Sequence, residues 1–182
     1  MFSVTCSNLK NILTPAKNGD VGFDLIASSD PVIVGERTGN DSPYYESIDY
    51  IEYEVDLKIE APEGFFALVY PRSSLSKYNL QICNSVGVID NGYRGNIKIR
   101  FNYLWQPKDL TKSKYIKDSE PDFIYENYIS EVDFSKIYKK GDKIAQLVFN
   151  RALIPALVEG KASETERGDS GFGSSDQKGD RQ

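Results

Sequence analysis

The feature that most constrains the fold is a strict alternation of apolar and polar residues in two segments of the chain. In Glu52–Glu60 the apolar side chains occupy every second position, at Tyr53, Val55, Leu57 and Ile59. Asn96–Tyr103 repeats the pattern, with Ile97, Ile99, Phe101 and Tyr103. Because successive side chains of a β-strand point to opposite faces, this period of two predicts two strands, each with one buried and one solvated face.

Three continuous apolar runs predict further strands, buried on both faces, at Phe65–Tyr70, Ile144–Phe149 and Ala152–Val158. The Asn91-Gly92 pair follows the apolar run Val86–Ile89 and precedes the second alternating segment, and Asn-Gly between apolar runs is a strong hairpin signal. Many short strands separated by Gly, Pro and Asn, with no long helical period, predict an all-β protein of the jelly-roll or β-barrel type.

Three polar segments lack these patterns. Glu36–Tyr50 is polar and rich in tyrosine, and we expect a long loop there. Trp105–Lys140 fits neither the period of a strand nor that of a helix, so its sequence is compatible with a hairpin or with a short helix. From Glu159 onward the chain is Gly, Ser and charged residues with one aromatic residue, Phe172, a composition that predicts a tail that is mobile without a ligand.

The length of the chain, 182 residues, favours one domain with a tail over two domains. We expect a β domain over residues 1–158, including an insertion at about 105–140, and a flexible C-terminal lid over residues 159–182. The two cysteines, Cys6 and Cys83, are too few for a disulfide scaffold, which is typical of a reducing compartment.

The longest apolar stretch is far shorter than the roughly 20 residues of a membrane span, and the N-terminus lacks the apolar core of a signal peptide. We therefore expect a soluble intracellular protein, in the cytoplasm or the nucleus, with no membrane partner.

The absence of histidine is the compositional fact that most narrows the chemistry. It removes the commonest zinc ligand and excludes Ser-His-Asp and Cys-His catalysis, which leaves carboxylates, Lys, Tyr and a hard metal ion. The net charge of −5 argues against a nucleic-acid partner, because such proteins need clustered Lys and Arg. Any anionic ligand must therefore be held by a local cluster of basic groups.

Several residues have the types that phosphate chemistry needs, although each also has a plain structural explanation. Arg72, Ser73 and Ser74 follow a predicted buried strand, where they either grip a phosphate or form an ordinary turn. Asp90 ends an apolar strand, where partial burial would suit a base toward water. An Asp before Asn-Gly is also a common turn former.

Tyr93, Asp24 and Gln146 likewise have both a functional and a plain structural explanation. Tyr93 either packs within the turn or forms a platform for a ligand. Asp24 either caps a turn or contacts a metal ion through water. Gln146, in a predicted buried strand, needs a hydrogen-bond partner because an unpaired buried amide is costly.

The tail segment at residues 167–175 has the parts of a nucleotide lid. It contains an Arg that can fork onto phosphate oxygens, glycines that let N–H groups approach an anion, two serine donors and an aromatic ring that can stack on a base. The alternative is a plain Gly/Ser-rich terminus.

The order of these segments carries more information than any one of them. Five segments resemble, in order and spacing, the five motifs of the trimeric dUTPase family: Val21–Leu25, Pro71–Leu75, Gly87–Gly95, Gly141–Leu147 and Arg167–Ser175. Members of that family are jelly-roll subunits that form homotrimers, in which three neighbouring chains build each active site. The resemblance implies a dUTP diphosphatase, a Mg²⁺-assisted enzyme that hydrolyses dUTP to dUMP and pyrophosphate.

The resemblance also implies a role for each site residue. Asp90 would activate the water that attacks the α-phosphorus, and Tyr93 would pack under the deoxyribose and exclude a ribose 2′-hydroxyl. The backbone around Asn84, Gly87 and Ile89 would read the edge of uracil. The phosphates would be held by Arg72, Ser73, Ser74 and Gln146. The lid over uracil and the γ-phosphate would consist of Arg167, Phe172, Gly173, Ser174 and Ser175. Asp24 would lie near the metal ion and its waters.

Two features depart from the family pattern. Ser170 and Asp176 stand where family tails usually have glycine, and a side chain at a position with positive φ costs energy. The insertion at about 105–140 is longer than the corresponding connection in compact members, although some phage members carry extra sequence there. We hypothesise that the insertion binds a protein partner.

Two other functions remain to be weighed. A dCTP deaminase shares the fold and an Arg-Ser-Ser-Leu motif, but it lacks the Gly-Phe-Gly tail and has a glutamate near the fourth motif, where this chain has Gln146–Asn150. A catalytically idle dUTPase-fold protein would bind nucleotide or a regulatory partner instead. Asp90, Arg72 and Arg167 argue against the idle protein, because a binding module does not need a water-activating carboxylate.

Overall fold

The computed structural model describes residues 3–117, 120–165 and 168. Within these residues the chain forms strands and short 3-10 helices and no α-helix, which confirms the predicted all-β fold. The chain divides into two compact units, residues 1–152 and 153–182. In the described part of the chain, no helix is long and apolar enough to span a membrane.

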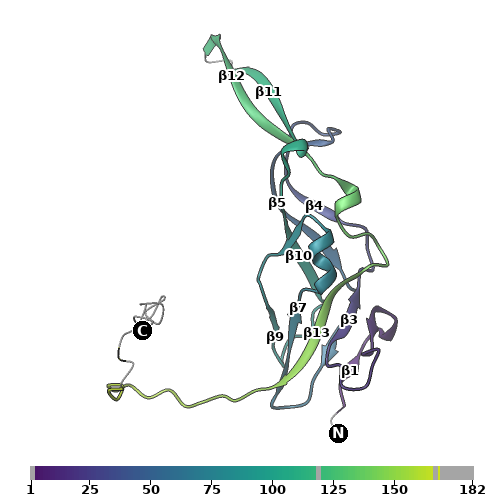
Figure 1. Cartoon of the computed structure of the whole chain (residues 1–182), viewed down its shortest axis with the longest axis vertical. Coiled ribbons are helices and arrows are strands. Elements are labelled where there is room, and N and C mark those ends of the chain that lie inside the picture. Colours follow the sequence, from purple (N-terminus) through teal and green to yellow (C-terminus); the bar gives the residue numbers. More distant parts are fainter. Residues whose placement is uncertain (1–2, 118–119, 166–167, 169–182) are drawn as a thin grey trace, which may run out of the picture. The chain divides into compact units, whose positions relative to one another are not determined.

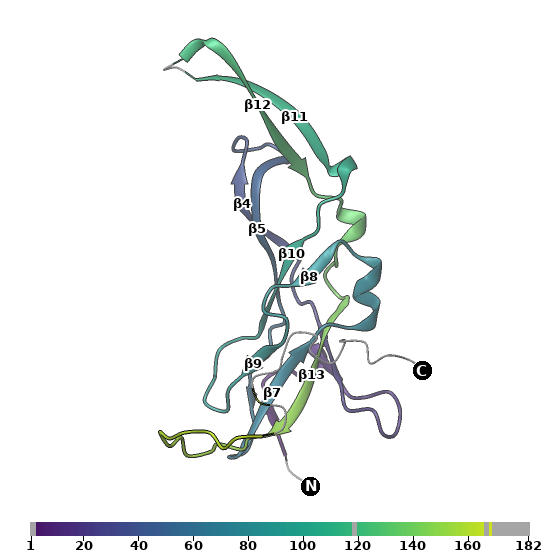
Figure 2. The same cartoon turned by 60° about the vertical axis from the view of Figure 1, so that its left-hand side comes forward.

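Two antiparallel sheets make up most of the first unit (Figures 1 and 2). One has the order β11-β12-β5-β10-β8, and β4 also pairs with β5. Its strands are β4 (Val32–Arg37), β5 (Tyr44–Glu54), β8 (Leu80–Ile82), β10 (Lys98–Tyr103), β11 (Leu110–Lys117) and β12 (Glu120–Glu131).

The other sheet has the order β2-β3-β13-β7-β9. Its strands are β2 (Ile12–Leu13), β3 (Phe23–Ile26), β7 (Phe65–Tyr70), β9 (Gly87–Ile89) and β13 (Lys143–Arg151). A separate pair consists of β1 (Thr5–Cys6) and β6 (Ile59–Glu60). The 3-10 helices are η1 (Leu9–Asn11), η2 (Ser73–Lys77), η3 (Pro107–Asp109) and η4 (Phe134–Lys136).

Both alternating segments bury the face that the sequence predicts. The buried side chains are Tyr53, Val55, Leu57 and Ile59 from the first and Ile97, Ile99, Phe101 and Tyr103 from the second, and all belong to one core cluster. The first segment is not one continuous strand, however, because β5 ends at Glu54 and Asp56 has a φ of 50°. The Ile97 amide donates to the Leu57 carbonyl, and the Ile97 carbonyl accepts from the Val55 amide. These two hydrogen bonds hold the chain on both sides of Asp56, so Val55 and Leu57 both still point into the core.

The segment expected to be a long loop, Glu36–Tyr50, is instead most of a β-hairpin formed by β4 and β5. Its register shifts between Val34 and Gly35, where a Cβ on Gly35 would lie 2.1 Å from the Ser47 carbonyl oxygen. Glycine therefore permits the close approach of the two backbones. The polar composition concealed this hairpin, because its outer part buries few side chains, chiefly Tyr45, among exposed polar residues.

Two further predictions about strands are wrong. The Asn91-Gly92 turn does not close a hairpin, because β9 pairs with β7 while β10 pairs with β5 and β8, so the turn crosses from one sheet to the other. The run Ala152–Val158 forms no strand after β13 ends at Arg151. The other two apolar runs form β7 and β13, although β7 buries only alternate residues, Ala67 and Val69.

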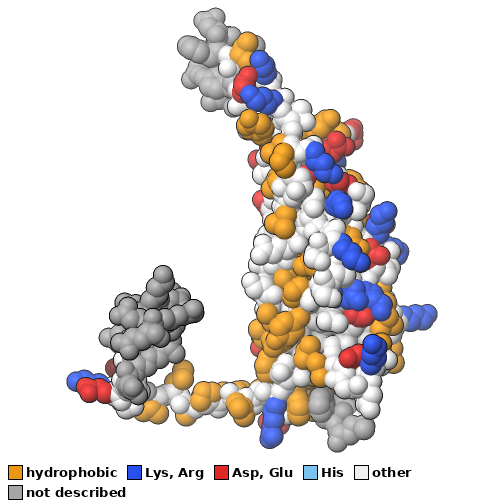
Figure 3. Space-filling model, viewed as in Figure 1, with side chains coloured by type: hydrophobic (Ala, Val, Ile, Leu, Met, Phe, Trp, Pro, Cys, Tyr) orange, Lys and Arg blue, Asp and Glu red, His pale blue; other side chains and the backbone are white. Residues whose placement is uncertain are grey.

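The insertion forms a hairpin of β11 and β12, one of the two structures that the sequence left open. Figures 1 and 2 show this hairpin extending past the end of β5, and Figure 3 shows side chains of both charges on it. At its base the Tyr103 hydroxyl donates to Asp109 Oδ2 at 2.9 Å and accepts from the Asp133 amide at 3.0 Å. Asp109 is only 6% exposed, so this network ties the hairpin to the core.

Candidate functional site

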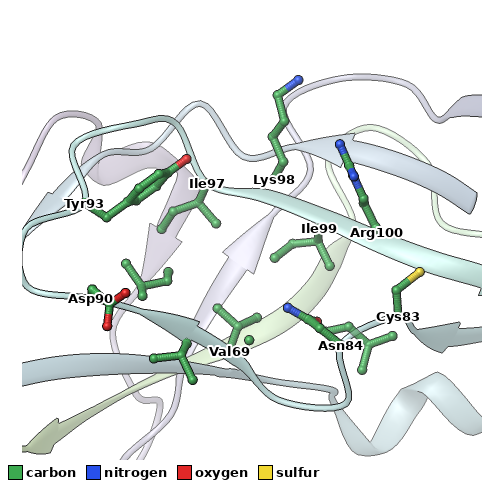
Figure 4. Close-up of a pocket in the computed structure, with 13 residues that line it drawn as sticks. Val69, Cys83, Asn84, Asp90, Tyr93, Ile97, Lys98, Ile99 and Arg100 are labelled. Carbon is green, nitrogen blue, oxygen red and sulfur yellow. The ribbon is translucent and has the colours of Figure 1, made fainter.

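A cavity of about 440 Å³ lies between β7, β9, β10 and the turn after β9 (Figure 4). Its volume is within the range of small-molecule sites. It brings together five residues that the sequence assigned to the base, the sugar and the attacking water: Asn84, Gly87, Ile89, Asp90 and Tyr93. Asp90 and Tyr93 lie at one end of the cavity and Asn84 at the other (Figure 4).

Asp90 is the first residue after β9 and follows the buried side chain of Ile89. The sequence predicts partial burial for this carboxylate, but the single chain leaves it exposed. No hydrogen bond or ion pair is made by its side chain among residues 3–117 and 120–165. Its carbonyl accepts the Tyr93 amide at 3.0 Å, which closes the turn. The carboxylate is therefore free to accept a proton from a ligand or a water molecule.

The position of the Tyr93 ring requires a glycine at position 95. Its ring packs over Gly95, where a Cβ would lie 2.4 Å from the Tyr93 hydroxyl oxygen and 2.6 Å from Cζ. The hydroxyl donates to the Asn96 carbonyl at 2.9 Å. The ring is thus fixed at both ends and forms one wall of the cavity (Figure 4).

Asn84 and Gly87 form a second close pair. A Cβ on Gly87 would lie 3.0 Å from the Asn84 Nδ2 atom and 3.4 Å from the Val69 Cβ atom. The absence of a side chain at Gly87 lets the Asn84 amide approach the backbone of β9, so donor and acceptor groups line this end of the cavity.

Sequence reasoning missed Asn91, which braces the turn beside Asp90. Its Nδ2 donates to the carbonyls of Ala61, Pro62 and Phe65 at 2.7, 2.9 and 3.2 Å. These carbonyls belong to the connection between β6 and β7 and to the first residue of β7. No sequence signal marked this contact, because an Asn before Gly is explained by turn formation alone.

Lys98 and Arg100 also line the cavity and were not predicted as site residues. Their Nζ and Nε atoms each lie 2.8 Å from a carboxylate oxygen of Glu52 on β5. These hydrogen bonds, that from Lys98 foremost, hold the pKa of Glu52 below its ordinary value against the effect of burial. The alternation could have indicated this group, because it places opposite charges on the same face of neighbouring strands.

A second cluster forms where β3, β13 and the end of β7 lie side by side. Gln146 on β13 pairs with Asp24 on β3 and with Tyr70 on β7, and Arg72 lies two residues after the end of β7. Arg72 Nε donates to Asp24 Oδ1 at 2.8 Å, and Lys143 Nζ lies 3.0 Å from Asp24 Oδ2. The Gln146 amide donates to Asp24 Oδ1 at 3.4 Å, which provides the partner that the sequence argument required.

Asp24 therefore organises this cluster. Burial raises the pKa of its carboxyl, but hydrogen bonds from Lys143 and Arg72 together outweigh the burial and hold the pKa below its ordinary value. Arg72 is also fixed by a bond from Nη1 to Ser74 Oγ at 3.1 Å. Sequence reasoning missed Lys143. Ser73 is exposed in η2.

The predicted lid residues, Arg167, Phe172, Gly173, Ser174 and Ser175, lie outside the described residues. In the described part of the chain, no three acidic, cysteine or histidine side chains gather as a metal site. Both oxygens of Asp24 are already engaged by cations. The residues present thus fit a Mg²⁺ ion held chiefly by the oxygens of a bound ligand, which is how Mg²⁺ commonly binds with nucleotides.

The fold and these two sites define an all-β protein with one cavity of small-molecule size and a separate cluster of polar and charged residues around Asp24 and Arg72. The family model for dUTPase matches residues 9–105 and 125–176. The chain belongs to the dUTPase family, as the sequence motifs predicted. Membership confirms the predicted enzyme class, dUTP diphosphatase, over a dCTP deaminase. The unmatched stretch between the two parts falls within the β11–β12 hairpin and its base.

Known relatives agree with this assignment. The deoxyuridine 5′-triphosphate nucleotidohydrolase of swinepox virus is 32% identical over 177 residues, which cover 94% of this chain and 96% of that protein. The structure of the Staphylococcus bacteriophage 80alpha dUTPase with dUPNHPP is 31% identical, with a TM-score of 0.60, and covers 94% of this chain and 97% of that chain.

A mutant dUTPase from phage phi11 of S. aureus, whose structure is described as revealing the coordination of a structural Mg(II) ion, has a TM-score of 0.53. It is 23% identical and covers 91% of this chain and 99% of that chain, so it supports the fold alone.

Proposed function

We propose that this protein hydrolyses dUTP to dUMP and pyrophosphate, with Asp90 as the base. The observation that carries the proposal is the cavity in which Asp90, Tyr93 and Asn84 meet in a chain of the dUTPase family. The Asp90 side chain has no partner among the described residues, as a base toward water requires. General-base catalysis of this kind contributes roughly 10²–10⁴-fold to rate.

The proposed reaction is one displacement at the α-phosphorus. A water molecule gives its proton to Asp90 while its oxygen forms a bond to the α-phosphorus. The bond from that phosphorus to the oxygen bridging the α- and β-phosphates breaks, and its electron pair leaves with pyrophosphate. Most of the catalytic effect in such reactions comes from positioning and charge neutralisation.

Substrate selection would come from the two ends of the cavity. Tyr93, held over Gly95, would pack under the deoxyribose and leave no room for a 2′-hydroxyl. The amide of Asn84 and the backbone of β9 near Gly87 and Ile89 would read the edge of uracil, which excludes thymine by its methyl group.

The phosphates would be held by the second cluster. Arg72, aligned by Asp24, would bind phosphate oxygens together with Ser73, Ser74 and Gln146. Mg²⁺ would neutralise charge on the triphosphate, arriving with the nucleotide, and Asp24 would contact it only through water because its oxygens hold Arg72 and Lys143.

We further propose a homotrimer with shared active sites. The support within the chain is an apolar segment that the structure leaves uncovered after β13. Leu153, Ile154, Leu157 and Val158 are between 86% and 93% exposed. So many large apolar side chains in six residues favour burial against another copy of the chain. The tail with Arg167, Phe172, Gly173, Ser174 and Ser175 would cover a site as a lid.

The hairpin of β11 and β12 is proposed as a surface for a protein partner. It lies largely outside the family match, and Ile124 and Tyr128 on β12 are 66% and 57% exposed. Lys112 and Lys114 pair with Glu126 across the strands, which leaves a mixed polar and apolar surface. A hairpin with a solvated edge of this kind suits docking of a further chain.

The test of the reaction is pyrophosphate release from dUTP, dCTP, dTTP and UTP with Mg²⁺, for the intact chain and for Asp90→Asn. We expect release from dUTP alone, lowered about 10²–10⁴-fold by the substitution. Tight binding of dUTP without release by the intact chain would contradict the proposal and favour the catalytically idle protein.

The test of the partner surface is a shortened hairpin. Excising residues 113–127 and joining Lys112 to Tyr128 through an Asn-Gly turn keeps the pairs Leu110–Ser130 and Thr111–Ile129 and the buried Asp109. We expect unchanged dUTP hydrolysis and loss of the partner in a pull-down. Retention of the same partner by the shortened chain would refute this surface.

A further inference from the structure

The position of the Asp90 carboxylate depends entirely on the backbone that carries it. Its side chain is exposed and makes no hydrogen bond or ion pair within residues 3–117 and 120–165. Upstream, the backbone is fixed because β9 pairs with β7 as far as Ile89 and Ala67. Downstream, the ladder has ended, and another contact must hold the chain.

Asn91 supplies that contact. Its single amide nitrogen reaches three backbone carbonyls, those of Ala61, Pro62 and Phe65, at 2.7, 2.9 and 3.2 Å. An amide nitrogen has two protons, so these acceptors saturate it. The Phe65 carbonyl belongs to the first residue of β7, the strand that pairs with β9. The Asn91 side chain therefore attaches the chain to β7 beyond the point where the backbone pairing of β9 with β7 has ended.

A neighbouring arginine braces the same residue from the other side. Arg94 Nη1 donates to the Asn91 carbonyl, and Arg94 Nη2 lies 2.9 Å from Glu60 Oε1. Both charged side chains are about half exposed, so this brace is the weaker one. Asn91 is thus held through its side chain and its backbone to one segment, residues 60–65.

We propose that Asn91 is a positioning residue that fixes Asp90 for attack on the α-phosphorus, a role that rests on the proposed function of Asp90 as the base. The amide clamp holds the carboxylate in place without touching it, so the oxygens stay free for water. Loss of the clamp displaces the base while leaving the cavity walls formed by Tyr93 and Asn84. A displacement on the order of 1 Å costs about 10²-fold in such reactions.

The decisive experiment is a double-mutant cycle of Asn91→Ala and Asp90→Asn, in which the steady-state kcat for dUTP is measured for each variant. We expect Asn91→Ala to lower kcat about 10–100-fold in the intact background and by less than about threefold in the Asp90→Asn background. KM for dUTP and the affinity for its imido analogue dUpNHpp should stay within about threefold. Asn150→Ala, which removes one amide bond to the Val148 carbonyl on β13, is the matched control.

An equal loss of kcat in both backgrounds would overturn the proposal, because it would show that Asn91 acts on the fold and not through Asp90. So would an unchanged kcat in the intact background. If Asn91→Ala does not fold, Asn91→Ser carries the same cycle, because its hydroxyl keeps one donor for the carbonyls and should lose less activity. Wild-type kcat in Asp90→Asn alone would instead refute the proposed function, which makes the two failures distinguishable.

Discussion

Asp90 directly follows β9 and Asp24 lies within β3, and the structure gives these two aspartates opposite surroundings. Asp90 is exposed and has no side-chain partner among the described residues. Asp24 is 16% exposed, and its two oxygens accept from Arg72 and Lys143. A carboxylate that is free can exchange a proton with water, whereas one held by two cations stays ionised and orients them. The surroundings, not the residue type, separate the two roles.

The direction of support also differs between the two sites. At the cavity, other residues hold Asp90: Asn91 clamps the turn, and Ile89 anchors the strand before it. In the second cluster, Asp24 itself holds the others, because it aligns the Arg72 guanidinium and the Lys143 ammonium. Substitutions at the two aspartates should therefore alter different steps, chemistry for Asp90 and phosphate binding for Asp24.

The largest effect that would sharpen this comparison is expected for Asp24→Asn. The amide keeps the shape of the carboxylate but loses its charge, so Arg72 is no longer held by an ion pair. We expect affinity for dUpNHpp to fall about 10–100-fold while affinity for dUMP, which lacks the β- and γ-phosphates, changes less than about threefold. Titration calorimetry of both chains measures the affinity for each of the two ligands.

Asp90→Asn is the control, because removing the base should leave binding of both ligands nearly intact. Equal losses of dUMP and dUpNHpp affinity in Asp24→Asn would break the comparison, since Asp24 would then support the nucleoside end of the site as well.

A smaller effect is expected from glycines, one at each site. Alanine at Gly95 would place Cβ 2.4 Å from the Tyr93 hydroxyl and push the ring off its place. Alanine at Gly22 would lie 3.2 Å from the Gln146 side chain, which can shift slightly. We expect Gly95→Ala to lower kcat/KM for dUTP about tenfold and to narrow the preference for dUTP over UTP, because the sugar platform moves.

Gly22→Ala should leave the preference between dUTP and UTP unchanged, since no part of that cluster faces the sugar in the proposed site. Steady-state rates with the two nucleotides test both variants. An unaltered dUTP to UTP ratio in Gly95→Ala would show that Tyr93 does not select the sugar.

The sequence predicted the positions of the strands better than it predicted which strands pair with one another. Alternation identified the strands around Tyr53 and Ile99 because a period of two is a local property. Asn91-Gly92 misled because turn chemistry says that the chain reverses, not which sheet receives the next strand. The β4–β5 hairpin was missed because Glu36–Tyr50 is largely polar and its buried residue Tyr45 is not part of a regular alternation.

The same limit applies to the site. Asp90, Tyr93 and Asn84 line one cavity, and because they come from one stretch of chain the motif could group them. The bonds of Asp24 to Arg72 and Gln146 span 48 and 122 residues of sequence, so only the register of β3 against β13 reveals them. The Asn91 clamp was hidden for a similar reason, because its acceptors are backbone carbonyls, which every residue has.

The smallest effect concerns the pH dependence of stability at Asp24. The pKa of its carboxyl is lower in the folded chain than its ordinary value. Its contribution to stability is therefore complete above the unfolded pKa of about 3.9 and is lost as the pH falls through the folded pKa. Asp24→Asn lacks this contribution at every pH. We expect wild type to exceed the variant in free energy of unfolding by about 1 kcal/mol at pH 7, with the difference shrinking below about pH 4.

Urea unfolding of both chains at pH 7, 5, 4 and 3, at one protein concentration, measures this difference. Other carboxyls with lowered pKa values, those of Glu52 and Asp133, titrate in both chains and cancel in the comparison. A difference that stays constant down to pH 3 would mean that the bonds to Arg72 and Lys143 do not depend on the charge of Asp24. The contrast between a held and a free aspartate would then rest on geometry alone, and Asp24 would stabilise the cluster by shape and not by ionisation.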